Sequence, residues 1–593
     1  MSVFFNGQLL VTPQTASAVN DDAMLNQNLS VGNSVAYVGE CTNGKPFTVL
    51  RFGSPDQARV ALGSGDLCEA VIKAFSPSAE TGSPGTVYAV RVNHAFQAKL
   101  DLMQGGDTPT VFGTLTGNTW GVDDMSTKCK VEVDASTGYA DITVEGVKAG
   151  IPWSVTGTDV NAPGVYIELL EDDAQITFSN TAHELFRVEM GYSLPWDDPQ
   201  FIGHSLHPEA YTTLGAIADY VETLRNQAGK QAYRMTFTDD AYRNLPSTIL
   251  DFARYDTKGS HGVSWNAYSI KKWFDNNVDG VTFVHNEAKK VYNYHGLLTQ
   301  DFKFLAAEKT EPTTPTDWNQ AFELLQTEDI QWVTPLTALD DIHAMAVAHC
   351  TVCSNVLKRE RRTILGMSLN VADDDAIKYA KKLNNDRVSL VHLGHYNYDL
   401  NGKLALKPAY MTAALISAAF AGLNPGTPLT NKTLSVMGWE RDLRNPTDTD
   451  KLLLGGVLPV ENTETGYKVT QSISTWLVDS KYNKREQSCG VAIDFTVRNI
   501  RNALDVLRGS KQTPILLSRA VSLAKGQLTE LARPEPQGPA VLVGDENSPA
   551  WRNVTATIEG DVLRVQFEAS PAIPNNYILV TMYAVPYSGS ATA

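Results

Sequence analysis

Few cysteines, no long apolar run and a deficit of basic residues limit what this chain can be. Six cysteines among 593 residues, at irregular spacings, do not make a disulfide framework and favour folding in a reducing cytosol, with disulfides formed later outside the cell left open. The longest apolar stretch, Ala413 to Leu423, has 11 residues and includes Ser417, whereas a membrane-spanning helix needs roughly 20. The 49 Lys and Arg against 66 Asp and Glu give a net charge of −17, which argues against nucleic acid as a partner.

The amino-terminal residues also lack the features of an export signal. No basic residue precedes the first apolar residues, and residues 1–22 contain no continuous apolar run of roughly seven or more. We therefore expect that the general secretory route does not export the chain and that the chain does not insert directly into a membrane.

The first ninety residues predict an arm followed by the start of a core. A chain of this length suggests about four folding units of roughly 150 residues each. Residues 1–30 carry short apolar patches without a helical period and predict an N-terminal arm. Residues 31–94 predict the first part of the core, with a strand, a helix and a second strand over 34–92. Ser54-Pro55 opens that helix, with the serine as its cap and the proline in its first turn.

The remaining residues predict an insertion, more core and a second arm. Residues 95–205 alternate apolar and polar residues and predict an inserted β-rich domain. Helix and buried-strand patterns over 206–400 predict the continuation of the core, 401–574 a C-terminal domain and 575–593 a C-terminal β arm. The predicted fold class is α/β (α+β) and multidomain: mixed β-sheet core domains flanked by helices, with the β-rich insertion and extended terminal arms.

The last strand-like segment is apolar on both of its alternating faces. Such a strand is stable only when both faces are buried, and as a free edge it promotes aggregation. It therefore pairs either inside its own domain or with a sheet of another chain, and the sequence alone leaves both open. One face carries Tyr577, Leu579, Tyr583 and Val585, and the other carries Ile578, Val580, Met582 and Ala584.

Two clusters have the residue types of a metal or redox site without the required pattern. Cys350-x-x-Cys353, preceded by His343 and His349, lies in the middle of a predicted helix, without a second cysteine pair or a helix N-terminus to lower the pKa of its thiols. These cysteines are therefore interpreted as structural. Asp373 to Asp375 open a predicted helix, where capping and the helix dipole explain them.

A third cluster, His392-x-x-His395 with Asp399, follows a buried strand. It supports a metal-dependent hydrolase only as the third interpretation, because the sequence does not clearly supply a complete ligand set. We predict no catalytic residues, no metal ion and no cofactor.

Residues 317–508 contain an ordered series of helix and strand signals. A helix that includes Asp317-Trp318 leads into a buried strand ending in Val333-Thr334-Pro335. A helix with a basic end, an Arg-Val-x-Leu-Val-His strand at 387–392, a small-residue helix and a Pro-Leu-Thr-Asn-Lys turn at 428–432 follow. In order and spacing this series resembles the contractile tail sheath proteins of myophages and related contractile injection systems.

A second stretch, residues 34–205, resembles the same family. Its strand-helix-strand ends in Tyr-Ala-Val-Arg-Val at 88–92, and the inserted β domain that follows contains Gly-Asn-Thr-Trp-Gly at 117–121. The two stretches cover about two thirds of the chain.

The resemblance implies a structural protein and not an enzyme. Sheath subunits stack as six-fold rings around a tail tube in a metastable extended state, and contract to drive the tube through the host cell envelope for genome delivery. The implied partners are further copies of the chain, the tail tube protein, and the baseplate and tail terminator proteins. The implied location is the tail of the virion, after assembly in the host bacterial cytoplasm, with the inserted β domain on the outer surface and not required for contraction.

The resemblance also implies that both terminal arms add strands to sheets of neighbouring subunits. In the N-terminal arm, Asn6-Gly7 permits a tight hairpin. The predicted C-terminal arm strand consists of Tyr577, Leu579, Thr581, Tyr583 and Val585 with the residues between them, and the N-terminal arm of Val3, Phe4, Phe5, Leu9, Leu10 and Val11.

For contact with the tube, the family uses a helix of the C-terminal domain, and the best match is Asp494 to Arg508. Arg498, Arg501 and Arg508 are then expected to pair with acidic residues of the tube; the alternative is an ordinary solvated helix face. The cysteines considered for crosslinks between subunits are Cys41, Cys68, Cys129 and Cys489. A different phage tail or baseplate structural protein is the second interpretation of the whole chain.

Overall fold

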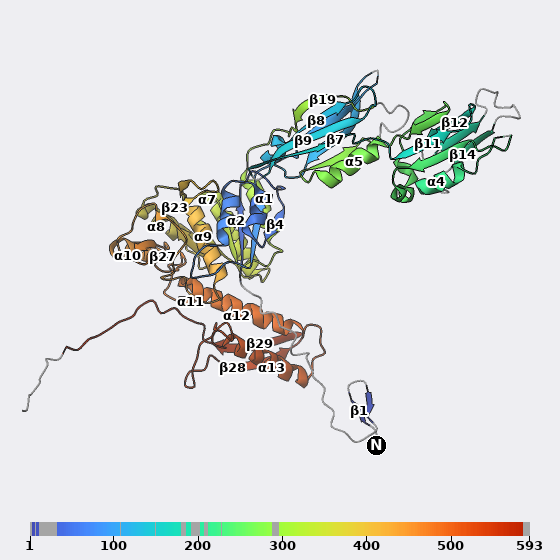
Figure 1. Ribbon diagram of the computed structural model, residues 1–593. Helices are drawn as coiled ribbons and strands as arrows, with labels where there is room; N and C mark the ends of the chain where they lie inside the picture. Colours follow the sequence, from blue (N-terminus) through green and yellow to red (C-terminus); the bar gives the residue numbers. More distant parts are fainter. Residues whose placement is uncertain are drawn as a thin grey trace, which may run out of the picture.

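The computed structural model describes residues 3–5, 8–10, 33–106, 108–148, 150–178, 186–190, 202–206, 211–226, 228–286 and 296–584. The described chain forms a central core, an insertion that projects from the core, and a carboxyl-terminal unit on another side of the core (Figure 1). The predictions for Asn6-Gly7, for residues 11–30 and for Val585 lie outside the described residues.

The core is built on a six-stranded sheet in the order β22-β21-β20-β3-β5-β4, in which all strands are parallel except the edge strand β4. Every residue of β3, β20, β21 and β22 is buried, as continuous apolar runs predict for strands covered on both faces. The strands are β3 (Ser34–Gly39), β4 (Val49–Phe52), β5 (Thr86–Arg91), β20 (Trp332–Pro335), β21 (Arg362–Gly366) and β22 (Val388–Val391).

Helices that follow the strands pack on this sheet. Helix α2 contacts α9 as well as β3 and β5, α9 extends over β20, β21 and β22, and α6 pairs with α7. Twelve of the 14 residues of α9 are buried, which confirms the predicted core helix of small residues. The helices are α1 (Pro55–Leu62), α2 (Asp66–Ala74), α6 (Pro315–Leu325), α7 (Asp340–Asn355), α8 (Asp373–Leu383) and α9 (Ala409–Gly422).

Local sequence sets where these helices begin and end. The Ser54 hydroxyl accepts a hydrogen bond from the Gln57 N–H at 3.4 Å and Pro55 lies in the first turn, which confirms the predicted start of α1. The predicted strand-helix-strand over 34–92 is also confirmed, because β3 and β5 are parallel neighbours. It contains two helices, since Gly63 (φ 71°) and Gly65 (φ 102°) turn the chain between α1 and α2.

The insertion consists of two units with separate hydrophobic cores. The chain leaves the first insertion unit after β10, forms the second unit, and returns to the first unit at α5, so the second unit is inserted within the sequence of the first (Figure 1). The first unit contains β6 (Lys99–Gln104), β7 (Thr110–Gly117), α3 (Val122–Ser126), β8 (Lys128–Val133), β9 (Ala140–Lys148), β10 (Ile151–Gly157), α5 (Asn266–Asn277), β18 (Val281–His285) and β19 (Gln300–Phe304).

The second insertion unit lies farther from the core (Figure 1). Its elements are β11 (Val165–Leu169), β12 (Ala174–Phe178), β13 (Phe186–Met190), β14 (Ile202–Leu206), α4 (Leu214–Val221), β15 (Tyr233–Phe237), the 3₁₀ helices η1 (Asp240–Asn244) and η2 (Ser247–Ile249), β16 (Ala253–Tyr255) and β17 (Gly259–Gly262).

The structure corrects the predicted end of the insertion at residue 205. Strands β15 and β17 pair with β11, and β18 and β19 pair with β7 and β8, so the chain returns to the core only after β19. The helices α4 and α5 cover insertion sheets. The spacing of apolar residues along a helix is the same whether the helix covers an insertion sheet or the core sheet. The sequence pattern therefore places the end of the insertion too early.

The Gly-Asn-Thr-Trp-Gly segment forms the contact between the first insertion unit and the core. The Gly44 N–H donates to the Thr119 carbonyl at 2.7 Å, and the Arg91 guanidinium donates to the Trp120 carbonyl at 2.8 Å. A Cβ atom on Gly121 would lie 2.1 Å from the Thr42 carbonyl oxygen, so only glycine permits this approach. The insertion is therefore docked on the core and not merely tethered to it.

Most of the acidic excess belongs to the insertion. Residues 95–312 contain 17 Lys and Arg against 30 Asp and Glu, whereas the remaining residues contain 32 against 36. The core and the carboxyl-terminal unit are therefore nearly balanced in charge, and the negative surface is concentrated on the projecting part of the molecule.

The core continues well beyond residue 400, which corrects the predicted start of the C-terminal domain at 401. Buried residues from Met411 to Val469 belong to the same hydrophobic cluster as β3 and β20. The pattern misses this because α9 and the short strands after it complete the core late in the sequence. These later elements are β23 (His395–Tyr398), β24 (Leu404–Lys407), β25 (Gly438–Trp439), α10 (Thr447–Leu454), β26 (Val460–Thr463) and β27 (Gly466–Val469).

The carboxyl-terminal unit comprises two long helices and a β hairpin, with small hydrophobic clusters of its own. None of the helices within the described ranges is long and apolar enough to cross a bilayer. The elements are α11 (Tyr482–Arg485), α12 (Gln487–Asp505), α13 (Pro514–Leu531), β28 (Trp551–Glu559) and β29 (Val562–Ala569).

Candidate assembly surfaces

Helix α12 joins the core to the carboxyl-terminal unit and contains most of the segment predicted to face a tube. It is amphipathic: Ala492, Phe495 and Ile500 are buried in the hydrophobic cluster that α12 shares with α13 and β28. The helix begins at Gln487 and ends at Asp505, so Arg508 lies beyond its last turn.

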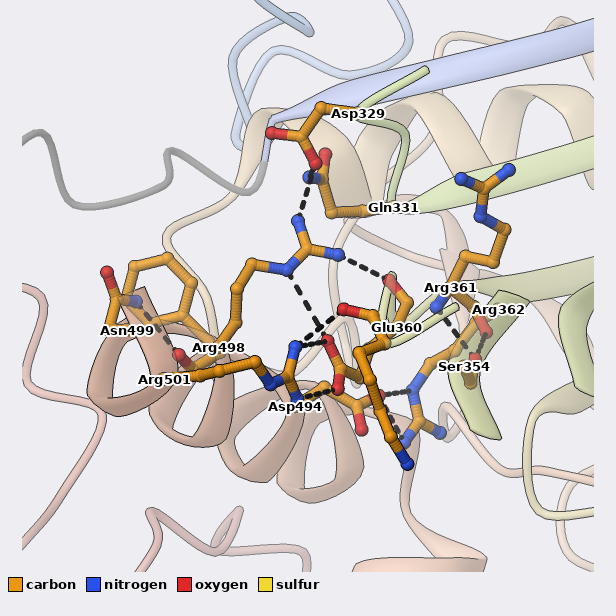
Figure 2. Close-up of polar contacts among 12 residues, drawn as sticks. Asp329, Gln331, Ser354, Glu360, Arg361, Arg362, Asp494, Arg498, Asn499 and Arg501 are labelled. Atoms are coloured by element: carbon orange, nitrogen blue, oxygen red, sulfur yellow. Dashed lines mark hydrogen bonds and ion pairs between the residues drawn. The ribbon is translucent and has the colours of Figure 1, made fainter. Parts of the chain in front are cut away.

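Two arginines of α12 bind a single buried carboxylate, that of Glu360 just before β21 (Figure 2). The Arg498 guanidinium donates to the Glu360 carbonyl at 2.7 Å and to Asp329 at 2.7 Å. The Arg501 guanidinium forms an ion pair with the Glu360 carboxylate and also donates to the Lys358 carbonyl at 2.5 Å. These bonds attach the middle of α12 to the segment that leads into the core sheet.

A second carboxylate, that of Asp494 in α12, binds two arginines of the core. Arg362 in β21 donates to it at 3.0 Å, and Arg387 just before β22 donates through two nitrogens at 2.9 and 3.0 Å. Burial raises the pKa of the Asp494 carboxyl, but the two guanidinium groups outweigh burial and hold that pKa below its usual range. Removing one partner from a buried pair of this kind costs about 3–5 kcal/mol, because a buried charge is left alone.

The structure therefore corrects part of the predicted tube-facing set. Arg498 is only 7% exposed and is used within the chain, so it is not a free cation on the surface. Arg501 is half-buried against Glu360. Arg508 is different, since its side chain is 83% exposed and its recorded ion partner is Asp505, one turn away. The tube contact itself stays a prediction, and of the three arginines Arg508 is the one available for it.

The C-terminal arm leaves the molecule without pairing to it. Residues 577–584 form no strand and extend away from the carboxyl-terminal unit (Figure 1). Tyr577 is 79% exposed, Leu579 93% and Tyr583 88%, and Thr581 is exposed as well. The sequence leaves open whether the arm pairs inside its own domain or with another chain. Among the described residues, which end at Ala584, the arm does not pair inside its own domain.

The hairpin β28–β29 is a two-stranded sheet with a free edge on each strand among the described residues. One face packs on the helices of the carboxyl-terminal unit through half-buried Ala556, Ile558, Leu563 and Val565. A hairpin of two strands is marginally stable alone and gains from additional strands. It is therefore a suitable acceptor for an extended segment.

In the N-terminal arm, β1 (Val3–Phe5) pairs antiparallel with β2 (Gln8–Leu10), so that Phe4 faces Leu9. This agrees with a hairpin in the arm.

All six cysteines are buried and free, which argues against the crosslinks between subunits that the sequence leaves open. Exposed fractions are 4% for Cys41, zero for Cys68 and Cys129, and 1% for Cys489. Burial raises the pKa of the Cys41, Cys68 and Cys129 thiols to about 12, and it also raises the pKa of Cys489. A buried thiol that stays protonated is a poor nucleophile for disulfide formation.

The residues of the hydrolase interpretation do not converge. His392 contacts Asp373 at 2.8 Å, whereas the His395 ring contacts the Thr412 hydroxyl at 2.9 Å. Asp399 lies in a turn, where it accepts hydrogen bonds from the Asn401 and Lys403 N–H groups. No group of three or more potential metal ligands occurs in the described residues.

The pair Cys350 and Cys353 also has a structural setting. His349 accepts a hydrogen bond from the buried Arg361 at 2.9 Å, and burial together with Arg361 lowers the pKa of His349 to about 3. Arg361 in turn donates to the Leu325 carbonyl at the end of α6. Through His349 and Arg361, these contacts join α7 to the end of α6 and to the residue just before β21.

Comparison with known proteins gives one consistent result. The chain is 24% identical over 606 residues to the tail sheath protein of Bacillus phage SP01, an alignment that covers 100% of this chain and 98% of the relative. It is 26% identical over 585 residues to the putative tail sheath protein of Enterococcus phage phiEF24C, covering 96% of each. No protein-family profile matches the chain.

Solved structures with the same fold agree with these relatives. The sheath tail protein from Desulfitobacterium hafniense superposes with a TM-score of 0.54 at 11% identity, covering 95% of this chain and 96% of the other. The sheath tail protein from Listeria innocua gives a TM-score of 0.53 at 12% identity, covering 92% and 94%. The predicted fold class is thereby confirmed over nearly the whole chain.

Proposed function

We propose that this chain, which aligns with phage tail sheath proteins over nearly its whole length, stacks as six-fold rings around a tail tube and contracts to drive the tube through the host cell envelope. That the chain is a structural subunit of the sheath type follows from its similarity and fold. The names of the relatives are those of sheath proteins, which accords with a chain that is not an enzyme and with a place in the virion tail.

The observation that carries the proposal is the C-terminal arm. Between Tyr577 and Tyr583, six large apolar side chains are largely exposed. Exposing this much apolar surface costs free energy of roughly 25 cal/mol per Å², which burial in a partner recovers. A chain that displays such a segment without pairing it is built to donate it to another molecule.

The acceptor that the geometry favours is the β28–β29 hairpin of a neighbouring copy. Both edges of the hairpin are free among the described residues, and the half-buried face on α12 and α13 continues into a core that an added strand can extend. The 17 residues from Tyr577 to Ala593 span at most about 60 Å when extended, enough to reach an adjacent subunit.

Each copy then both donates and accepts a strand, so the same contact repeats from one copy to the next. Many such contacts make a stable tube from individually modest interactions. The N-terminal hairpin Val3–Leu10 would add to the same lattice. The tail tube, contacted through Arg508 and its surroundings, and the baseplate and tail terminator proteins at the two ends complete the proposed set of partners. Assembly would take place in the host cytoplasm.

The insertion would lie on the outside of this tube. It projects from the core and carries most of the excess of acidic over basic residues, which suits a solvent-facing exterior (Figure 1).

A complementation experiment tests the proposed exchange. One variant lacks residues 577–593 and keeps the hairpin. The other keeps the arm but carries Ala556→Pro and Val565→Pro, one on each hairpin strand. The hairpin turn has two residues, so the flanking pair Glu559 and Val562 is hydrogen-bonded across the hairpin. Along each strand, N–H groups then point alternately toward the partner strand and away from it. The N–H groups of Ala556 and Val565, three positions from the flanking pair, point away from the partner strand. Proline there blocks strand addition and leaves the hairpin bonds intact.

Neither variant alone should polymerise, whereas a mixture of the two should give a one-to-one heterodimer, because one supplies the arm and the other the hairpin. Light scattering and analytical ultracentrifugation measure this. Unblocked polymerisation of the proline variant would contradict the choice of the hairpin as acceptor. Polymerisation of the arm deletion would contradict the role of the arm.

A further inference from the structure

The described chain contains one place where the C-terminal arm is fastened to its own subunit just before it becomes free. Ala572 makes the last backbone hydrogen bond in the described chain before the arm, from its N–H to the Val541 carbonyl at 2.9 Å. Four residues later the Asn576 side-chain amide donates to the Glu486 carboxylate at 3.4 Å. From Tyr577 onward the large apolar side chains are about four-fifths exposed or more.

Glu486 is an unusual residue to find as the attachment point. It is only 2% exposed, and its carboxylate forms no ion pair within the described residues. Three neutral groups hold it: Gln471 at 3.0 Å, Ser472 at 2.7 Å and Asn576. Burial raises the pKa of this carboxyl, and these hydrogen bonds oppose the rise. A buried carboxylate depends strongly on each of its few donors.

The position of Glu486 matters as much as its burial. It directly precedes α12, and its backbone pairs with Ile473 in a segment of the core. The arm is therefore fastened at the joint between the core and the carboxyl-terminal unit, although the chain reaches this point from the end of β29. Movement of either unit at this joint would be transmitted to the start of the arm.

The polar attachment of Asn576 rests on this one bond. Its amide oxygen is buried and has no hydrogen-bond partner within the described part of the chain. The preceding residue, Asn575, is exposed and makes no recorded side-chain contact there. The two neighbouring asparagines therefore have the same side chain, but only Asn576 contacts Glu486.

We propose that Asn576 and Glu486 are positioning residues that fix where, and in which direction, the C-terminal arm leaves its subunit. This inference rests on the proposed exchange of the arm between copies. If the start of the arm is fixed, residues 577 onward search a limited volume and reach one neighbour in one orientation. If it is free, the same arm reaches several neighbours and the lattice loses its order.

Limited proteolysis of the isolated subunit tests the fastening without requiring assembly. Chymotrypsin cleaves after exposed tyrosines, and a protease must bind several residues on each side of the bond in extended form. Tyr577 lies beside Asn576, whereas Tyr583 lies seven residues beyond Asn576, so cleavage after Tyr583 is an internal reference. We expect the initial rate after Tyr577, divided by that after Tyr583, to rise about tenfold in Asn576→Ala, as loss of a hydrogen bond to a charged group predicts.

The matched control is Asn575→Ala, which should leave the ratio unchanged. Asn576→Asp places a second carboxylate against Glu486 and should raise the ratio at least as much as alanine. Thermal unfolding should be the same in Asn576→Ala and Asn575→Ala, which separates local release from misfolding. Equal ratios in Asn576→Ala and Asn575→Ala would overturn the fastening.

Assembly tests the positioning role separately. Polymers of Asn576→Ala should form with lower helical order in electron micrographs than polymers of Asn575→Ala. A raised cleavage ratio together with polymers of unaltered order would overturn the positioning role. Failure of the proposed function gives a different result from failure of the positioning role. In that case neither the wild-type chain nor Asn575→Ala would polymerise, whereas the cleavage ratio would still rise in Asn576→Ala.

Discussion

Asp494 of α12 and Arg362 of β21 are joined by a hydrogen-bonded ion pair at 3.0 Å, although 132 residues separate them in the sequence. Together with Arg387, this contact fixes the helix that carries the carboxyl-terminal unit against the core sheet. The unit that presents the hairpin and the arm is therefore held to the core by buried charges as well as by the chain.

Asp494→Asn should lower the free energy of unfolding by up to about 3–5 kcal/mol, because it leaves the buried Arg362 and the half-buried Arg387 without the charge of Asp494. Chemical denaturation measures the change. Asp505→Asn on the same helix is the control: its exposed pair with Arg508 predicts a change below about 1 kcal/mol. Equal effects of the two substitutions would show that the buried network does not hold α12.

The same carboxylate predicts a particular response to acid. Since the pKa of Asp494 is depressed in the folded chain, its contribution to stability is complete above the unfolded value of about 3.9 and is lost as pH falls through the folded value. Denaturation measured between pH 5 and pH 2 should therefore show a shallower loss of stability in Asp494→Asn than in the wild type. Parallel curves would contradict the depressed pKa.

Charge reversal should separate the two kinds of arginine near α12. Arg498→Glu places a carboxylate beside Glu360 and Asp329 and should destabilise the monomer. Arg508→Glu should leave the melting temperature within about 1 °C, because its side chain is 83% exposed, and should weaken assembly on the tail tube protein. Unchanged tube-templated assembly of a folded Arg508→Glu variant would remove this residue from the tube contact.

The cysteines should be unreactive in the native chain. Burial and raised pKa predict that 5,5′-dithiobis(2-nitrobenzoic acid) labels none of the six at pH 8 within minutes, and that all six react after unfolding. A Thr581→Cys variant, with its added thiol in the exposed arm, provides the positive control. Rapid labelling of the wild-type protein would reopen crosslinking between subunits.

Much of the core could be predicted from the sequence because its strands are continuous apolar runs. Ser34–Gly39 and Thr86–Arg91 are buried parallel neighbours, as their composition predicts, and Ser54-Pro55 starts a helix as its chemistry requires. The arm was also predictable, since a segment that is apolar on both faces needs a partner wherever it lies.

Domain boundaries and the role of Arg498 could not be predicted in the same way. Periodicity indicates that α4 and α5 are helices but not which sheet they cover, so the sequence pattern places the end of the insertion too early. An arginine beside an apolar stripe has the same pattern whether it faces solvent or a buried carboxylate, and Glu360 lies 138 residues from Arg498. The contact of Asn576 with Glu486 spans 90 residues and likewise has no local signal.

Electron microscopy of the chain produced together with its tail tube protein, beside a deletion of residues 577–593, tests whether the arm joins the subunits. We expect sheathed tubes with six-fold symmetry from the undeleted chain, and bare tubes with monomeric subunits from the deletion. A sheath of the same form from the deletion would contradict the claim that the C-terminal arm joins one subunit to the next.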